Sequence, residues 1–448
     1  MRWRARPVRE APIAPRPLRS LTPQEREARL ARAREQVGTA ARRQYAAQVL
    51  EDVARDGDAA VAAYTARWDG VALAPERFAV TRDEVEAAYR ALPDAVSEAL
   101  RVAIARSRRY NLWLRPPELA LTELEPGIVV GVRYTACRSA GIYVPSGKGS
   151  FPSMVVAMVT PAVVAGVEDL TVVVPPRPDG SADPAVLVAA DLLGVRRIVR
   201  CNGAAGVAAL ALGTASIPRA DVVVGPGNPV IAAVQLAAAA YGARPLVLLG
   251  PSEAVVLADA SADVDRLVAD LLNEAEHGAD SAVLLVTTEA TLAAAVAARL
   301  PDALAGLPQP RRDFARAALL DQGGLWIADD LEEAIAWINA YAPEHLMLAV
   351  RDPFALLPRI RHAGEILLGT HTPFAAANYA IGVPAALPTG GAAVAASGVT
   401  VWSFLKATSL ASLDERGLRT AGPVAVRLGT YEGFPAHVRA LTVREVSA

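Results

Sequence analysis

The chain has 448 residues, of which 53% are hydrophobic and 21% charged, a globular composition that excludes a disordered chain. This length predicts roughly two or three domains. The formal net charge of -2 excludes the basic surface that binds nucleic acid or an anionic membrane, and no run of about 18 apolar residues could span a bilayer.

The N-terminal part is predicted to be mainly helical. Residues 1–20 are rich in Pro and Arg, and we expect them to be poorly ordered. A helical pattern runs from about Thr22 to Trp68, and Thr81-x-x-Glu84 is a capping box that begins another helix. Cys137 and Cys201, the only cysteines, do not make a disulfide framework, and no signal peptide is evident. The sequence therefore predicts a cytoplasmic protein.

Short strand patterns alternate with Ala-rich helical patterns after residue 116. The predicted strands are 128–133, 141–144, 170–174, 197–201, 221–224, 245–249, 254–257, 282–286, 345–350 and 365–368. Repeated β-α-β units imply parallel strands covered by helices. We therefore predict an α/β fold of two doubly wound Rossmann-like lobes, with N-terminal helices and a mostly helical tail beyond about residue 398. Ligands are expected at the carboxyl ends of the strands, between the lobes.

Two pairs of polar residues are candidates for chemistry. Glu274 and His277 share one face at the end of a predicted helix, a spacing that suits two ligands of one metal but also an ordinary solvated ion pair. Glu344 and His345 follow Pro343 between a predicted helix and a strand. Such a pair can divide general-base work, and the simpler alternative is a polar turn.

Two glycine-rich turns could hold a dinucleotide. The segments 141–149 and 224–228 each follow a predicted strand and place backbone N–H groups where a pyrophosphate could bind. Neither is a G-x-G-x-x-G fingerprint. Lys148 is either a phosphate contact or a solvated loop lysine.

Taken in this order and spacing, these segments resemble the histidinol dehydrogenase family over roughly residues 40–448. The motifs that carry the resemblance are 141–145, 203–213, 225–228, 250–253, 276–278, 343–346 and 432–437. The resemblance implies aldehyde-dehydrogenase-like lobes, a bound Zn²⁺, and NAD as the oxidant. It further implies that a small polar alcohol is oxidised through the aldehyde to the carboxylate, as in the conversion of L-histidinol to L-histidine in histidine biosynthesis. The family is a homodimer whose C-terminal tail completes the partner's site.

The resemblance also implies a role for each matching residue. His345 would accept the alcohol proton, and Glu344 would activate water for attack on the aldehyde. Tyr143 and Asn228 match NAD-binding positions, and substrate contacts match Ser252, Glu344, His345 and Glu432. The zinc ligands would be Glu274, His277, Asn378 and His437, the last supplied across the dimer interface.

Four positions depart from the family pattern. Glu274 replaces a Gln and Asn378 replaces an Asp, so the metal site keeps one carboxylate, one amide and two imidazoles. Ala385 replaces a substrate-binding His, and Ala205 replaces a Gln of the NAD region. Two substrate interpretations therefore stay open, L-histidinol or another alcohol such as a sulfonated or phosphonated diol. Rival hypotheses are a catalytically silent binding protein and a metal-dependent hydrolase.

The predicted organisation has four parts. An N-terminal arm and first helix occupy residues 1–38. A catalytic and metal-binding lobe combines residues 39–140 and 252–398, and an NAD-binding lobe spans residues 141–251. Residues 399–448 form the tail that reaches the partner subunit.

Overall fold

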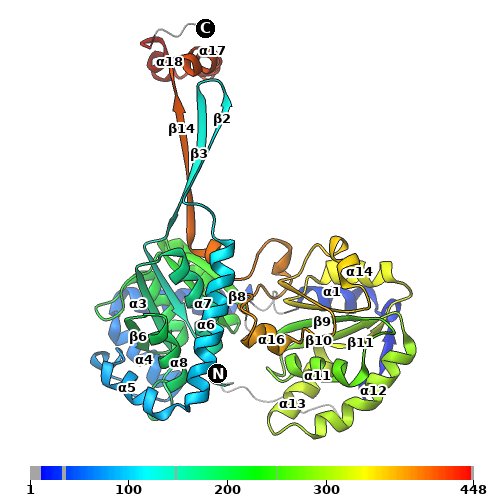
Figure 1. Ribbon diagram of the computed structural model, residues 1–448. Helices are drawn as coiled ribbons and strands as arrows, with labels where there is room; N and C mark the ends of the chain where they lie inside the picture. Colours follow the sequence, from blue (N-terminus) through cyan, green and yellow to red (C-terminus); the bar gives the residue numbers. More distant parts are fainter. Residues whose placement is uncertain (1–11, 33–36, 147–148, 250, 445–448) are drawn as a thin grey trace. The chain divides into compact units, whose positions relative to one another are not determined.

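The computed structural model describes residues 12–32, 37–146, 149–249 and 251–444 (Figure 1). The chain divides into two compact units. The larger unit comprises residues 1–114 and 138–404, and the smaller unit comprises residues 115–137 and 405–448. The smaller unit is therefore built from two segments that lie far apart in the sequence.

A six-stranded parallel sheet organises one part of the larger unit. Its strands are β1 (Pro15–Pro17), β9 (Glu253–Ala258), β10 (Ala282–Thr287), β11 (Gly324–Ile327), β12 (His345–Ala349) and β13 (Glu365–Leu368). They are arranged in the order β1-β11-β10-β9-β12-β13. Strands β9, β10 and β12 are buried along their whole length, as expected for parallel strands covered by helices on both faces.

Helices cover both faces of this sheet. The apolar residues of α11 (Val264–Ala275), α12 (Ala290–Ala305), α13 (Arg311–Ala317) and α16 (Phe374–Tyr379) share one core with alternate strand residues. The other strand residues pack with α14 (Leu331–Tyr341), against which α1 (Pro23–Ala31) lies. The short helix α15 (Pro353–Leu356) follows β12.

A five-stranded parallel sheet organises the rest of the larger unit. Its strands are β4 (Ser139–Tyr143), β5 (Asp169–Val174), β6 (Arg197–Arg200), β7 (Val222–Gly227) and β8 (Arg244–Leu249), in the order β6-β5-β4-β7-β8. The helices that connect them are α7 (Pro152–Ala165), α8 (Pro184–Leu192), α9 (Gly203–Leu212) and α10 (Pro229–Ala238). The predicted fold class is confirmed, because both sheets are parallel and doubly wound.

The N-terminal helices differ from the predicted domain organisation. Helices α3 (Ala40–Asp56) and α4 (Asp58–Asp69) pack on α9 and α10, while α5 (Arg82–Ala91) and α6 (Asp94–Leu114) pack on α7 and α8. Assigning residues 39–140 to the catalytic lobe was therefore wrong. The apolar faces of α3 and α4 complete the core of the five-stranded sheet instead, and residues 115–137 belong to the smaller unit.

The N-terminal segment is also more ordered than predicted. Residues 15–17 pair in parallel with β11, and Leu18 is fully buried. A Pro-rich strand can occupy this place because an edge strand needs only some of its N–H groups for pairing. Residues 1–11 lie outside the described part of the chain.

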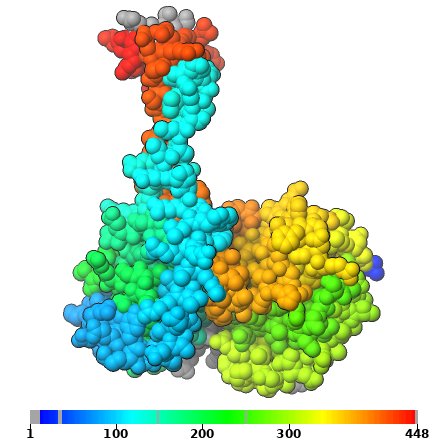
Figure 2. Space-filling model, viewed as in Figure 1, coloured from blue at the N-terminus to red at the C-terminus, as the bar shows by residue number. Residues whose placement is uncertain are grey.

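The smaller unit is a narrow antiparallel sheet with two helices (Figures 1 and 2). Strand β3 (Ile128–Ala136) pairs with both β2 (Leu119–Glu125) and β14 (Leu405–Leu413). Helix α17 (Glu415–Tyr431) follows β14. The chain then turns at Gly433, whose φ is 77°, and α18 (Pro435–Thr442) begins. The prediction of a mostly helical tail missed β14, whose Ala, Ser and Leu residues have little intrinsic strand preference. No helix among the described residues is long and apolar enough to cross a membrane.

Strands β4 and β7 approach each other closely at Gly225. A Cβ at this position would lie 2.3 Å from the carbonyl oxygen of Tyr143, a backbone atom that cannot rotate away. We expect Gly225→Ala to lower the free energy of unfolding by roughly 1–3 kcal/mol, measured as a lower urea midpoint. Gly38→Ala is the matched control, because a Cβ there meets nothing within 4 Å. Equal stability of the two variants would contradict the close approach.

Candidate active site

The candidate catalytic residues gather at the amino edge of the six-stranded sheet. Glu253, His345 and Glu365 are the first residues of β9, β12 and β13, which are neighbours in the sheet. Helix α11, which carries Glu274, ends just before β10. These candidate residues therefore lie at the opposite edge from the carboxyl ends, where ligands were expected. A helix between parallel strands runs against them, so its C-terminus arrives at their amino edge.

Glu344 is positioned by the turn between α14 and β12. Ala342 ends α14 with a φ of 49°, an uncommon left-handed conformation for a residue with a Cβ. The chain then reverses through Pro343, and the buried Oε2 of Glu344 accepts a hydrogen bond of 3.0 Å from the backbone N–H of Glu253. A fixed carboxylate therefore lies next to the imidazole of His345.

His345 is oriented by a carboxylate on the neighbouring strand. Its Nδ1 lies 2.5 Å from Oε1 of Glu365, which is its direct partner in the β12–β13 register. The ring of Phe374 packs edge-on against the imidazole. Because Nδ1 is engaged by Glu365, Nε2 is the nitrogen left to accept a proton. It lies 3.7 Å from Oε1 of Glu344 and 4.0 Å from Oε2 of Glu274.

Burial and neighbouring charges shift both members of this pair. Burial raises the pKa of Glu344 to about 8 and outweighs the opposing charge of His345. Burial by itself would lower the pKa of His345, but the carboxylates of Glu274, Glu344 and Glu365 raise it to about 10. A carboxylate with a pKa near neutrality is suited to general-base catalysis.

Three of the four predicted metal ligands come together beside His345. Glu274 is fully buried, and its Oε1 accepts a hydrogen bond of 3.0 Å from Nδ2 of Asn378 on α16. Nε2 of His277 lies 3.9 Å from Oε2 of Glu274. On its other side, Nδ1 of His277 lies 2.9 Å from Oγ of Ser252. The structure therefore brings the predicted metal and substrate residues of the larger unit together.

These residues fit a divalent cation. Oε2 of Glu274 is buried without a hydrogen-bond partner, because Nε2 of His277 and Nε2 of His345 lie 3.9 Å and 4.0 Å away, beyond hydrogen-bond distance. The carboxylate, imidazole and amide oxygen are donors that Zn²⁺ accepts once the Asn378 amide is turned. Among the described residues, no group of three or more His, Cys, Asp or Glu side chains could hold a metal ion. The fourth predicted ligand, His437, lies in the smaller unit.

The predicted cofactor residues lie at the carboxyl edge of the five-stranded sheet. Tyr143 ends β4, and Asn228 follows β7, its neighbour. Tyr143 is buried against Gly203 at the start of α9, and the side-chain oxygen of Asn228 caps α10. Ala205 is fully buried in the core. Lys148 lies outside the described residues, so its suggested phosphate contact stays a prediction.

Glu432 and His437 belong to the smaller unit. Glu432 ends α17, His437 lies in α18, and both side chains are exposed. The ring of His437 packs against the ring of Phe434, with 5.1 Å between the ring centroids. Their roles in a partner's substrate and metal site stay predictions.

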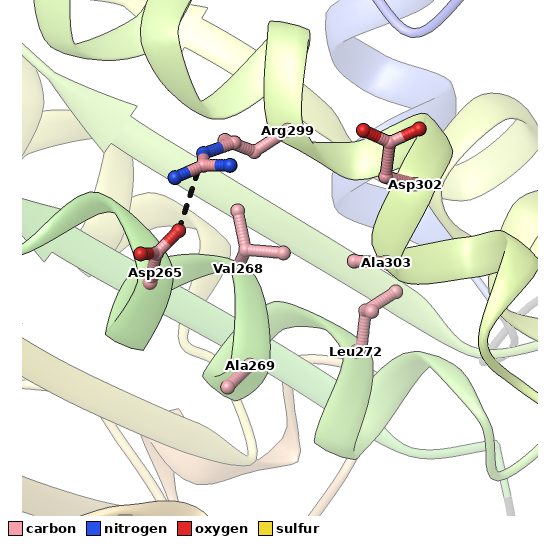
Figure 3. A pocket seen from close by; sticks show the side chains of 7 residues that line it. All are labelled: Asp265, Val268, Ala269, Leu272, Arg299, Asp302 and Ala303. Carbon is pink, nitrogen blue, oxygen red and sulfur yellow. Dashed lines mark ion pairs between the residues drawn. The ribbon is translucent and has the colours of Figure 1, made fainter.

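Ala385 and a surface groove lie elsewhere in the larger unit. Ala385 is half-buried in the loop after α16. A groove of about 300 Å³ lies between α11 and α12, where Arg299 and Asp265 form an ion pair of 3.3 Å (Figure 3). Its α11 residues face away from Glu274, because positions 265, 268, 269 and 272 share the opposite side of that helix. The groove is therefore not part of the candidate site.

Sequence analysis missed two residues of this cluster, Glu253 and Glu365. Both begin strands, where a polar residue is ordinarily interpreted as the end of a loop. Only the strand order, which places β12 between β9 and β13, brings them to Glu344 and His345. The available signal was that each Glu begins an apolar strand that pairs with the strand of His345.

The fold and the cluster define a class of protein, an α/β enzyme with a buried Glu–His pair beside an unsatisfied carboxylate. The sequence model of the histidinol dehydrogenase family matches residues 32–445. The chain therefore belongs to the histidinol dehydrogenase family, whose members are oxidoreductases.

Individual relatives agree with this assignment. A histidinol dehydrogenase of Synechocystis sp. is 39% identical over 410 residues, which cover 89% of this chain and 92% of the relative. A histidinol dehydrogenase homolog of Colwellia psychrerythraea is 38% identical over 396 residues and covers 88% of each chain. The crystal structure of histidinol dehydrogenase from Elizabethkingia anophelis matches with a TM-score of 0.87 at 31% identity, covering 95% of this chain and 96% of that one.

Proposed function

We propose that this protein catalyses the NAD- and zinc-dependent oxidation of a small polar alcohol through the aldehyde to the carboxylate, with L-histidinol as the first candidate substrate. The observation that carries the proposal is the placement of His345 and Glu344 beside the unsatisfied Oε2 of Glu274. Membership of the histidinol dehydrogenase family supports it. The same proposal places the protein in the cytoplasm, where NAD is available.

Removal of the alcohol proton falls to His345. Its Nδ1–H donates to Glu365, so the ring is held in one orientation with Nε2 as the acceptor. Zinc bound at Glu274 would offset one of the charges that raise the pKa of His345, which favours the neutral ring that can accept the proton. The carboxylate of Glu365 also stabilises the imidazolium that forms when Nε2 takes the proton. Proton transfer and hydride loss from the carbon together yield the aldehyde.

Activation of water for the second oxidation falls to Glu344. Its Oε2 is fixed by the N–H of Glu253, which leaves Oε1 to accept a proton from water. Attack of that water on the aldehyde carbon gives the hydrate, whose oxidation yields the carboxylate. The raised pKa of Glu344 matches this work, because the side chain can hold and release the proton near neutral pH.

Residues of both units would hold the absent groups. Glu274, His277 and Asn378, with His437 of the partner subunit, would hold the zinc ion, and Ser252, with Glu432 of the partner subunit, would contact the substrate. Tyr143 and Asn228 would contact NAD. Bound zinc would supply a positive charge that favours loss of the hydroxyl proton and offsets the charge of Glu274. Bound NAD would accept the hydride in both oxidations.

The surface of the smaller unit supports a homodimer. All seven residues of β2 are exposed, and they include Leu119, Leu121 and Leu124. Tyr431 and Phe434, near the turn between α17 and α18, are exposed as well. Apolar surface gathered on a narrow sheet indicates that another protein surface covers it. We propose that a second copy of this chain covers it and that the partner's His437 is the fourth ligand of the zinc site.

Steady-state turnover tests the proposed function. The purified protein should reduce NAD with L-histidinol, lose this activity with a strong zinc chelator, and regain it with added Zn²⁺. Dihydroxypropanesulfonate should be assayed in parallel, because Ala385 replaces a substrate-binding His of the family. Faster turnover of this diol than of L-histidinol would identify the diol as the better substrate. Absence of NADH with every alcohol tested would contradict the proposal. In that event, hydrolysis without NAD would favour the hydrolase hypothesis, and the absence of any turnover would favour the silent binding protein.

A further inference from the structure

Arg32 is a buried arginine whose guanidinium reaches the back of the candidate site from the end of α1. Its side chain is 5% exposed, and Nη1 lies 2.9 Å from Oε2 of Glu253. Nη2 donates a hydrogen bond of 2.6 Å to the carbonyl oxygen of Tyr341, and the guanidinium carbon lies 3.7 Å from the centre of the Tyr341 ring. The match to the family begins at residue 32, so α1 itself lies outside it.

The backbone of Arg32 is strained. Its φ of 46° and ψ of -137° lie outside the regions that residues with a Cβ ordinarily adopt. Such a conformation costs free energy and persists only where surrounding contacts hold it. The ion pair with Glu253 and the contacts with Tyr341 are those contacts. These contacts hold the guanidinium between Glu253 and Tyr341.

Glu253 connects this guanidinium to the general base. Its carboxylate accepts a hydrogen bond of 3.1 Å from the N–H of Gly390, while its own N–H donates to Oε2 of Glu344. One residue thus binds Arg32 and Gly390 through its side chain and Glu344 through its backbone. Any movement of the Glu253 side chain is transmitted over a few bonds to the donor that fixes Glu344.

Arg32 supplies a positive charge to a cluster of buried carboxylates. Glu253, Glu274, Glu344 and Glu365 are all buried around His345. Burial raises the pKa of Glu253, and Arg32 opposes that rise. Among the ion pairs of the described residues, Arg32 supplies the charge of this cluster that does not change with pH.

We propose that Arg32 is a positioning residue for the proposed aldehyde oxidation: it holds Glu253, and through the backbone of Glu253 it holds the general base Glu344. The inference rests on the proposed function for the role of Glu344. It assigns the N-terminal segment, from β1 to Arg32, a part in the site on which it docks.

The experiment compares Arg32→Met, Glu253→Gln and the double variant with the wild-type protein. Arg32→Met should slow aldehyde oxidation by about ten- to a hundredfold, as expected for loss of a group that orients a catalytic residue. Alcohol oxidation should fall much less, because His345 is oriented by Glu365. The double variant should recover to the rate of Glu253→Gln alone, since no buried charge is then left without a partner. Arg32→Lys should retain more aldehyde oxidation than Arg32→Met.

Arg29→Met is the matched control on the same helix. Arg29 donates to the carbonyl oxygens of Gln322 and Gly323 and stacks on Trp326, so it docks α1 without reaching Glu253. Equal losses in Arg29→Met and Arg32→Met, or equal losses of both oxidations, would overturn the proposal, since α1 docking alone would then explain them.

Amide hydrogen exchange gives a readout that does not depend on turnover. The N–H groups of Glu253 and Gly390 should exchange faster in Arg32→Met than in Arg29→Met, because both are bonded within the linked cluster. If the wild-type protein oxidised no alcohol, the proposed function would fail, whereas faster exchange would still support the link from Arg32 to Glu344. Unchanged exchange would overturn the link itself.

Discussion

Glu344→Gln should oxidise the alcohol but accumulate the aldehyde. The alcohol step needs only the proton acceptor His345, whereas water attack needs a carboxylate at position 344. The amide oxygen of Gln can still accept the hydrogen bond from the N–H of Glu253, so the turn before β12 should keep its geometry. We expect aldehyde oxidation to fall by roughly 10²- to 10⁴-fold, the contribution typical of a general base.

Measuring the two steps separately checks this result. The variant should release one NADH per alcohol consumed instead of two, and the aldehyde can be trapped with semicarbazide. Supplying the aldehyde directly isolates the second step. Glu332→Gln, an exposed change on the helix that precedes the turn, should leave both steps unchanged. Equal losses in both steps of Glu344→Gln would show that the two residues do not divide the work as proposed.

His277→Ala and His437→Ala should each be inactive alone and partly active together. Each variant removes an imidazole from the proposed zinc site, so homodimers of either have no complete site. A heterodimer pairs the intact larger unit of one chain with the intact tail of the other, and one of its two sites is complete. Random reassociation should therefore restore about one quarter of wild-type activity.

Coexpression with two different affinity tags gives a pure heterodimer for this measurement. Zinc content provides a second readout, which should rise to about one ion per heterodimer. A chain that carries both substitutions, paired with either single variant, should stay inactive and serves as the control. A pure heterodimer without activity or zinc would show that each site is built within one chain, and failure to isolate any heterodimer would contradict the dimer.

How much of the site the sequence could predict depended on spacing along the chain. Glu274 and His277 share a helix turn and Glu344 and His345 are adjacent, so local patterns were sufficient to find them. Glu365 reaches His345 only through the register of β12 with β13. Arg32 reaches Glu253 across nearly half the chain, after an edge strand and a helix have docked. Local periodicity in the sequence does not predict contacts between distant residues, because the order of the strands is decided by packing.

The same reason explains why the sequence did not indicate the amino edge of the six-stranded sheet as the place of the candidate residues, and why it did not predict strand β14. The expectation of a ligand at the carboxyl ends stays a prediction for β4 and β7, where the glycine-rich turn at the end of β7 is followed by α10. In the six-stranded sheet the polar residues come before the strands instead. Strand β14 has no strong strand-forming sequence, and its conformation is set by nine consecutive pairings with β3.

The pairing of β14 with β3 also has a consequence for how the chain is made. Translation at about 5–20 residues per second delivers β14 roughly 15 to 55 s after β3, because some 270 residues separate them. During that interval the β2–β3 hairpin presents an open edge next to a ribosome that is still synthesising the rest of the protein. Nascent chains on one messenger could associate through that edge, so slow elongation before residue 405 should favour aggregation and the action of chaperones at the hairpin.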